Sequence, residues 1–270
     1  MTDTSHAPPV PTVLIIEDSN VQSKIISKQI KGLTSFETAV AHSMEEAVEM
    51  LDARRDAIFI AVIDLNLPDA PDGEAVDLCL RYALPSIVLT ATYDDRLRET
   101  FLEKKVVDFF FKGTIEDMDP MVRSLERIYR NAFTTALVVD DSLTERHLMK
   151  RYLEVQNFTV MEAEDGAAAL ELLEAHPEIR LMVTDYEMPR LDGLELTVQA
   201  RHIRRSDSLA IIGVSAMGSG ALSALFLKHG ANDFLTKPFE AEEFYCRCNN
   251  TMTMLDLMRE LRDCYAANET

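Results

Sequence analysis

The chain repeats one motif, and this repeat constrains the fold more than any other feature of the sequence. LIIEDS at residues 14–19 and LVVDDS at residues 137–142 each lead from apolar residues into two adjacent acids and a serine. Glu17 therefore aligns with Asp140 at an offset of 123 residues (140 minus 17). A strand that ends at a solvated helix cap would explain one occurrence. Since neighbouring like charges repel and are costly to bury, finding the motif twice indicates a function for the acid pair.

Three later landmarks keep the same order at nearly the same offset. Asp64 aligns with Asp185 (185 minus 64, or 121), in FIAVIDLNLPD and IRLMVTDYEMPRLDG. Thr90 aligns with Ser215 and Lys112 with Lys237, both at an offset of 125. Repeats this long predict two homologous domains rather than a solenoid. We expect a loose tail at 1–11, domains at 12–132 and 135–250, and an extension of the last helix at 251–270.

Within each copy, short apolar runs alternate with helical patterns. In the second copy we predict strands near 135–139, 158–162, 180–184, 210–214 and 232–236, and helices near 142–155, 166–175, 191–204, 219–229 and 239–263. The first copy shows the same alternation of strand and helix patterns and ends in a helix near 116–132. The run IRLMVTD is apolar at consecutive positions, as in strands covered on both faces. The fold class is therefore α/β, with two tandem, doubly wound, five-stranded parallel sheets.

The first helix of the second copy shows a helical repeat of apolar residues. In SLTERHLMKRYLEV, the positions Leu143, His147 with Leu148, Arg151 with Tyr152, and Val155 return on one face. This periodicity predicts a helix over residues 142–155.

Composition and charge restrict the class of protein. With 47% hydrophobic and 27% charged residues the chain is globular, and no apolar run reaches the length of a membrane span. We therefore expect a cytoplasmic protein with no membrane contact. The four cysteines lack the spacing of a metal site or a disulfide framework. The net charge of −19 argues against direct binding of nucleic acid.

Every landmark follows a predicted strand, and parallel sheets bind ligands at the carboxyl ends of their strands. The second copy places five residues there: Asp140, Asp141, Asp185, Ser215 and Lys237. The first copy has the corresponding set Glu17, Asp18, Asp64, Thr90 and Lys112. Three converging carboxylates need a cation, and oxygen ligands favour Mg²⁺. Since Mg²⁺, a lysine and a hydroxyl all bind phosphoryl oxygens, the central aspartate is the candidate nucleophile of an aspartyl phosphate.

With these motifs, both halves resemble the receiver domains of response regulators, a flavodoxin-like family phosphorylated by sensor histidine kinases or phosphotransfer proteins. The resemblance runs from about residue 12 to 262. It implies that Asp64 and Asp185 accept the phosphoryl group. It also implies that a third metal contact comes from the backbone carbonyls of Asn66 and Glu187.

The same resemblance implies a switch. The hydroxyl of Thr90 or Ser215 moves toward the phosphate, an aromatic residue (Phe109 or Phe234) turns inward, and the surface around the last strand changes. The family's cis peptide bond is expected at Lys237–Pro238. The first copy has Lys112–Gly113 instead, so its corresponding loop should be looser.

The C-terminal segment is longer than the last helix of a receiver domain. Met254, Leu257, Leu261 and Cys264 are spaced 3, 4 and 3 apart, and Leu255 and Met258 widen the stripe. This indicates a short coiled-coil seam in a homodimer. The alternative is that these residues pack on the domain's own sheet. The arrangement resembles the front of REC–REC–GGDEF diguanylate cyclase regulators, which make cyclic di-GMP, but these 270 residues contain no GGDEF motif.

Three hypotheses follow. The first is a phosphorylation-controlled regulator that reports through dimerisation or its last helix. The second is a stand-alone adaptor or phosphate sink whose first receiver is a passive docking or dimerisation domain. The third is a phosphatase-like hydrolase, which would need a general acid two residues after the nucleophile. Asn66 fails this requirement, and Glu187 meets it without a substrate-capping insertion.

Overall fold

The structure is a computed structural model that describes residues 10–91, 100–101, 104–112, 118–218 and 220–268. Backbone contacts divide the chain into two compact units, Met1–Tyr129 and Arg130–Thr270. We call them receiver 1 and receiver 2 after the domains that they resemble. Most of the predicted tail and Gly113 lie outside the described residues. No helix in the described part of the chain combines the length and apolarity of a membrane span.

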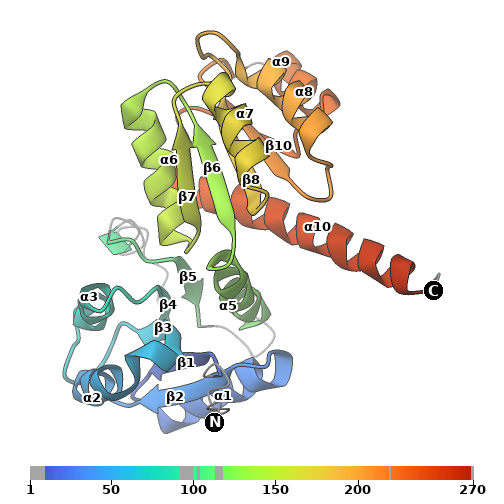
Figure 1. The fold of residues 1–270 in the computed structure, drawn as a ribbon. Coiled ribbons are helices and arrows are strands. Elements are labelled where there is room, and N and C mark those ends of the chain that lie inside the picture. The colour runs from blue at the N-terminus through green and yellow to red at the C-terminus, as the bar shows by residue number, and fades with distance from the viewer. Residues whose placement is uncertain (1–9, 92–99, 102–103, 113–117, 219, 269–270) are drawn as a thin grey trace, which may run out of the picture. The chain divides into compact units, whose positions relative to one another are not determined.

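Receiver 1 contains a five-stranded parallel sheet in the order β2-β1-β3-β4-β5 (Figure 1). Its strands are β1 (Thr12–Ile16), β2 (Glu37–Ala41), β3 (Ile58–Asp64), β4 (Ser86–Thr90) and β5 (Asp108–Phe111). Its helices within the described residues are α1 (Asn20–Leu33), α2 (Met44–Arg54), α3 (Glu74–Arg81) and α5 (Asp119–Asn131), with a 3-10 turn η1 (Arg55–Ala57). The last two residues of α5 belong to receiver 2.

Receiver 2 repeats this topology in the order β7-β6-β8-β9-β10. Its strands are β6 (Thr135–Val139), β7 (Thr159–Ala163), β8 (Ile179–Asp185), β9 (Ala210–Ser215) and β10 (Asp233–Thr236). Its helices are α6 (Leu143–Val155), α7 (Gly166–Ala175), α8 (Gly193–Ile203), α9 (Gly220–Lys228) and α10 (Ala241–Asn268). Each predicted strand boundary is within one residue of the observed one, and the predicted fold class is confirmed.

The core of receiver 2 has two layers because alternate strand residues face opposite sides of the sheet. Ala136 and Val138 of β6 pack with α6 and α10 on one face. Leu137 and Val139 pack with α7, α8 and α9 on the other (Figure 1). Both layers are apolar, which explains why the strands read as continuous apolar runs. The carboxyl ends of the strands remain open for a site.

Helix α6 was predicted near 142–155 and spans Leu143–Val155. Met149 and Leu153 are its fully buried residues, whereas Leu143 is 57% exposed. His147 is also exposed. Tyr152 and Val155, which belong to the apolar repeat, are partly buried against the core.

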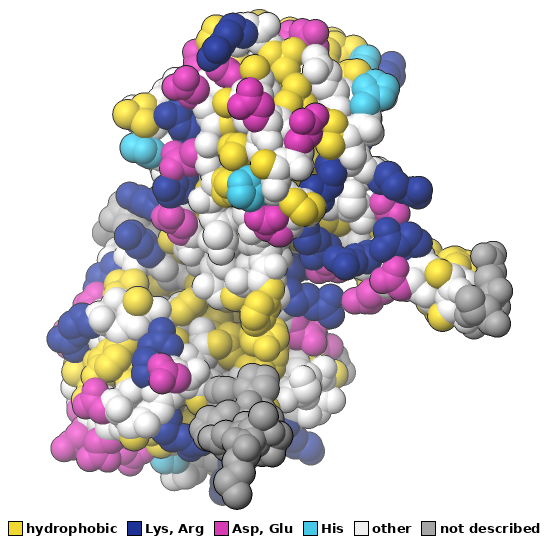
Figure 2. Space-filling model, in the orientation of Figure 1, with side chains coloured by type: hydrophobic (Ala, Val, Ile, Leu, Met, Phe, Trp, Pro, Cys, Tyr) yellow, Lys and Arg dark blue, Asp and Glu magenta, His cyan; other side chains and the backbone are white. Residues whose placement is uncertain are grey.

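Helix α10 combines the two alternatives proposed for the C-terminal segment. Met252 and Leu255 are buried in the core of receiver 2, so Leu255 does not widen an exposed stripe as predicted. Met254, Leu257, Met258 and Leu261 are exposed, and the helix projects beyond the sheet (Figure 1). Figure 2 shows hydrophobic side chains on this projecting part among charged groups.

Candidate functional site

The acid pair of receiver 1 begins where β1 ends. Ser19 caps α1 by accepting a hydrogen bond from the Gln22 amide, so the chain turns sharply after the strand. Glu17 is 1% exposed and Asp18 is exposed. The turn therefore buries one carboxylate at the strand end and leaves the next one in solvent.

Lys112, which follows β5, joins the buried acids of receiver 1. Its ammonium lies 2.7 Å from Glu17 Oε2 and 2.7 Å from Oδ2 of Asp64, at the end of β3. The three side chains come from three strand ends, as the sequence predicted. With Asp18 beside them, three carboxylates face one lysine, which leaves a net negative charge.

Receiver 2 has the same arrangement around Lys237. Its ammonium lies 2.8 Å from Asp140 Oδ2 and 2.7 Å from Asp185 Oδ1. Glu145, on the first turn of α6, adds a further carboxylate at 3.9 Å, which the sequence analysis missed. Its position three residues after the capping Ser142 was the only available signal. The Lys237–Pro238 peptide bond is cis.

Burial and ion pairing act in opposite directions on these groups. Burial raises the pKa of Glu17, against the lowering effect of Lys112. It likewise raises the pKa of Asp185, against that of Lys237. Burial alone would lower the pKa of Lys237, but its hydrogen bonds to Asp140 and Asp185 outweigh this and raise it. Lys237 thus stays charged, while desolvation disfavours the charged form of Asp185.

The loop after each central aspartate folds back onto it. The Asn66 amide donates to Asp64 Oδ1 at 3.2 Å, and the Glu187 amide donates to Asp185 Oδ2 at 2.7 Å. These amides lie in the residues whose carbonyls were predicted as metal contacts. Each carboxylate is therefore held from two sides, by a lysine and by its own loop.

The two receivers differ in the position of the second, exposed acid of the pair, Asp18 in receiver 1 and Asp141 in receiver 2. Glu17, Asp18 and Asp64 each bring a carboxylate oxygen within 4.8 Å of the others, the geometry of a possible metal site. Among the described residues of receiver 2, Asp140, Asp141 and Asp185 do not form such a group. The oxygen-only donor set of receiver 1 suits Mg²⁺. In receiver 2 the exposed Asp141 would have to turn inward to complete the set.

The predicted switch hydroxyls are buried at the ends of their strands. Thr90 ends β4 and is 2% exposed, and Ser215 ends β9 and is fully buried. The Ser215 hydroxyl accepts a hydrogen bond from the Met217 amide at 2.9 Å.

The predicted switch aromatics differ between the receivers. Phe234 is 7% exposed and its ring centroid lies 5.3 Å from that of Phe226 of α9. Phe109 is partly buried beside the apolar layer of α2 and α3. Phe234 therefore occupies an inward position in this structure.

Gly193 contacts the site backbone in a way the sequence analysis did not assign. A Cβ at this position would lie 2.0 Å from the carbonyl oxygen of Asp185. The Gly193 amide also donates to the Tyr186 carbonyl at 3.0 Å. The glycine in MPRLDG was the signal, because close backbone approach requires the absence of a side chain.

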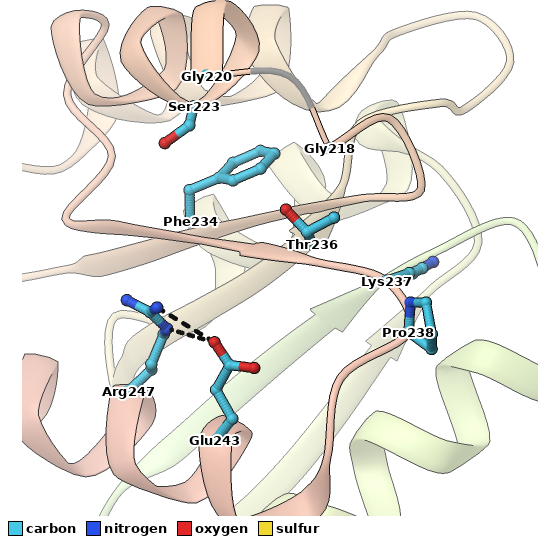
Figure 3. Close-up of a pocket in the computed structure, with 9 residues that line it drawn as sticks. All are labelled: Gly218, Gly220, Ser223, Phe234, Thr236, Lys237, Pro238, Glu243 and Arg247. Carbon is cyan, nitrogen blue, oxygen red and sulfur yellow. Dashed lines mark hydrogen bonds and ion pairs between the residues drawn. The ribbon is translucent and has the colours of Figure 1, made fainter.

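A pocket opens beside the lysine of receiver 2, between α9, β10 and α10, with a volume of about 530 Å³ (Figure 3). Its lining includes Phe234 and Thr236 of β10, Lys237, and Ser223 of α9. Arg247 bonds to Glu243 and to Asp233 along one side. The pocket lies on the surface that the resemblance predicted to change on phosphorylation.

Comparison with known proteins identifies the family. The family model described as "Response regulator receiver domain" matches residues 13–123 and again 136–249. The chain therefore belongs to the response regulator receiver family, and it contains two receiver domains in tandem.

Individual relatives agree with this assignment. The chain is 38% identical over 104 residues to a chemotaxis protein CheY homolog of Campylobacter jejuni, covering 38% of this chain and 80% of the relative. It matches chemotaxis protein CheY1 of Helicobacter pylori at 38% identity, covering 38% of this chain and 84% of that protein. A solved putative two-component system response regulator/GGDEF domain protein is 39% identical, with a TM-score of 0.83, covering 91% of this chain and 99% of that chain. The tandem arrangement thus recurs in a solved structure.

Proposed function

We propose that this response regulator accepts phosphoryl groups on both Asp64 and Asp185, in a Mg²⁺-dependent reaction. The donor is the phosphohistidine of a sensor histidine kinase or of a phosphotransfer protein. One observation carries the proposal: in each receiver a single lysine bridges the first acid of the pair and the central aspartate, at 2.7–2.8 Å. This geometry places a fixed positive charge beside the proposed nucleophile.

The chemistry needs one nucleophile and a means of offsetting charge. A carboxylate oxygen of Asp185 attacks phosphorus, the new O–P bond forms as the N–P bond breaks, and the electron pair returns to the donor imidazole. Lys237 offsets the charge of the phosphoryl oxygens, and the Ser215 hydroxyl donates to one of them after leaving its contact with the Met217 amide. Asp140, Asp141 and Asp185 would hold Mg²⁺, which would supply further positive charge at the same oxygens. The set Glu17, Asp18, Asp64, Thr90 and Lys112 does the same in receiver 1.

The passive-docking alternative for receiver 1 is not favoured by the geometry. Lys112 contacts both Glu17 and Asp64, and Asp18 completes a three-carboxylate group. A domain retained only for docking has no need to keep a buried acid such as Glu17, whose pKa is raised by desolvation. We therefore propose two active acceptor sites.

We propose that the output passes through α10 to a homodimer. Met254, Leu257 and Leu261 are each more than half exposed and follow heptad spacing, so an identical helix presents the matching a and d positions. Phosphorylation biases receiver 2 toward a conformer with a changed surface around β10 and the root of α10. By analogy with the solved response regulator/GGDEF domain protein, we propose that the output controlled is a GGDEF cyclase and hence cyclic di-GMP signalling.

The test is incubation with Mg²⁺ and acetyl phosphate, followed by intact-mass analysis. We expect two phosphoryl groups on the wild type, one on Asp64→Asn and one on Asp185→Asn. A single group that is lost only with Asp185→Asn would make receiver 1 a docking domain. No addition at all would overturn the acceptor role.

A further inference from the structure

In both receivers, a side chain from elsewhere in the fold holds the backbone between the two acids. In receiver 2, Arg146 Nη1 of α6 donates to the backbone carbonyl of Asp140 at 2.6 Å. In receiver 1, His42 Nδ1, just after β2, lies 2.9 Å from the backbone carbonyl of Glu17. A carbonyl only accepts hydrogen bonds, so Nδ1 is the protonated nitrogen of His42 in this contact.

The other backbone contacts of the two first acids are the same. The Glu17 amide donates to the Ala41 carbonyl, and the Asp140 amide donates to the Ala163 carbonyl. In each case the amide of the serine two residues on donates to the acid's carboxylate. Only the donor to the carbonyl differs, and it differs in both identity and origin.

The two donors do not occupy equivalent positions in the repeat. At the offset of the acid pair, Arg146 corresponds to Ser23 (146 minus 123), which is 2% exposed in α1. Glu164 follows Ala163 as His42 follows Ala41. The same carbonyl is thus satisfied by different elements in the two halves, which indicates that the contact itself matters.

We propose that Arg146 and His42 are positioning residues for the divalent cation, an inference that rests on the proposed function. The peptide unit is planar, so fixing the carbonyl of the first acid also fixes the amide of the second. The direction in which Asp141 or Asp18 presents its carboxylate is set by this peptide. The donor therefore prepares the second acid to complete the cation site.

Charge and positioning predict opposite effects for Arg146. Its guanidinium, 3.5 Å from Glu162 Oε1, is a positive charge near the acids. If only charge mattered, removing it would strengthen Mg²⁺ binding, because cation–cation repulsion would fall. If it positions the Asp140–Asp141 peptide, removing it weakens Mg²⁺ binding. The sign of the change separates the two roles.

The variants follow from the contacts. Arg146→Met removes the donor and keeps most of the stem. Lys150→Met is its matched control, because Lys150 lies on the same helix, carries the same charge and pairs with the same Glu162, at 2.5 Å. His42→Ala removes the donor of receiver 1. His42→Asn should restore it, since the side-chain amide nitrogen of asparagine can take the place of Nδ1.

The measurement is calorimetric titration of the full chain with Mg²⁺, with one site silenced at a time. Glu17→Gln with Asp64→Asn isolates receiver 2, and Asp140→Asn with Asp185→Asn isolates receiver 1. We expect Arg146→Met and His42→Ala each to weaken Mg²⁺ binding about tenfold at their own site, as outer partners of metal ligands do. Lys150→Met and His42→Asn should stay near the wild-type affinity.

The proposal would be overturned if Arg146→Met bound Mg²⁺ as tightly as the wild type or more tightly and His42→Ala bound it unchanged. It would also be overturned if the wild type bound no Mg²⁺. If Arg146→Met fails to fold, judged by its Tm without Mg²⁺, the Mg²⁺ affinities of His42→Ala and His42→Asn test the proposal instead. Acetyl phosphate labelling of the wild type is a separate measurement that tests the acceptor role. A wild type that is not labelled but shows these affinity changes would refute the acceptor role and leave the positioning role standing.

Discussion

Lys237 Nζ lies 2.7 Å from Oδ1 of Asp185, in a site where that aspartate is 6% exposed. The contact does not fully stabilise the ionised aspartate, because burial still raises its pKa. The ion pair therefore keeps a reactive carboxylate in place without fully offsetting its desolvation.

Replacing Lys237 with Met should destabilise receiver 2, because Asp140 and Asp185 would be left as neighbouring buried anions. We expect a loss of about 2 kcal/mol, less than for fully buried pairs because the lysine side chain is 16% exposed. Urea denaturation with and without Mg²⁺ measures it, and added Mg²⁺ should recover part of the loss. Lys150→Met, a more exposed ion pair, should cost less than about 1 kcal/mol; equal losses in the two variants would contradict this.

Replacing Asp185 with Asn should stabilise the protein at neutral pH. A folded-state pKa above the usual value means that the folded state binds the proton more tightly, so ionisation costs stability as the pH rises through that pKa. The asparagine side chain of this variant cannot ionise, so its Tm advantage should be largest at neutral pH and shrink near about pH 4, the ordinary pKa of an aspartate. Glu17→Gln should show the same trend, since burial raises that pKa too. A Tm difference that grows on acidification would refute the account.

Replacing Gly193 with Ala should disturb the acceptor site directly. The new Cβ would lie 2.0 Å from the Asp185 carbonyl oxygen, so the backbone on one side must move. We expect about 2 kcal/mol of destabilisation and weaker phosphorylation of Asp185, with Asp64 unaffected. Peptide mapping after acetyl phosphate treatment separates the two sites. The matched control is Gly220→Ala, whose Cβ would meet nothing within 4 Å and should leave both sites labelled.

Replacing Asn131 with Ala should destabilise receiver 2 through a buried amide network. The Asn131 side chain is 0% exposed and donates to the Gln156 carbonyl at 2.9 Å and to Asn249 Oδ1 at 3.1 Å. Removing it deprives one buried and one partly buried acceptor of a hydrogen bond, at a cost of about 1–3 kcal/mol by denaturant unfolding. Thr253→Ala, which removes an exposed hydroxyl from the helix that carries Asn249, should change stability by less than about 0.5 kcal/mol.

Most of the fold and of the candidate site could be predicted from the sequence because the motif occurs twice. The strand ends that hold Asp64, Lys112, Asp185 and Lys237 could be located because buried parallel strands are continuous apolar runs followed by polar residues. Those residues meet because parallel strands present their carboxyl ends at one edge of the sheet. No knowledge of side-chain contacts was required for that step.

The side-chain partners of the site and the buried faces of the helices could not be predicted, because they depend on contacts between elements. His42 and Arg146 contact the carbonyls of Glu17 and Asp140 from positions that the repeat does not align. Apolar periodicity located α6, but it did not show that Met149 and Leu153 are the residues buried in the core. Leu255 and Leu257 are equally apolar neighbours, yet one is 1% and the other 54% exposed, because only packing against the sheet distinguishes them.

The exposed stripe of α10 gives a prediction about assembly. Replacing Leu257 and Leu261 together with Lys should lower the dimer fraction measured by light scattering after acetyl phosphate treatment, because like charges would meet at successive seam positions. The two leucines are 54% and 58% exposed, so Tm should change little. Leu255→Lys is the contrasting variant, since it would bury a charge in the core and unfold receiver 2. If the double variant dimerises as the wild type does, the seam is not the dimer contact, and the output must leave receiver 2 through the surface around β10.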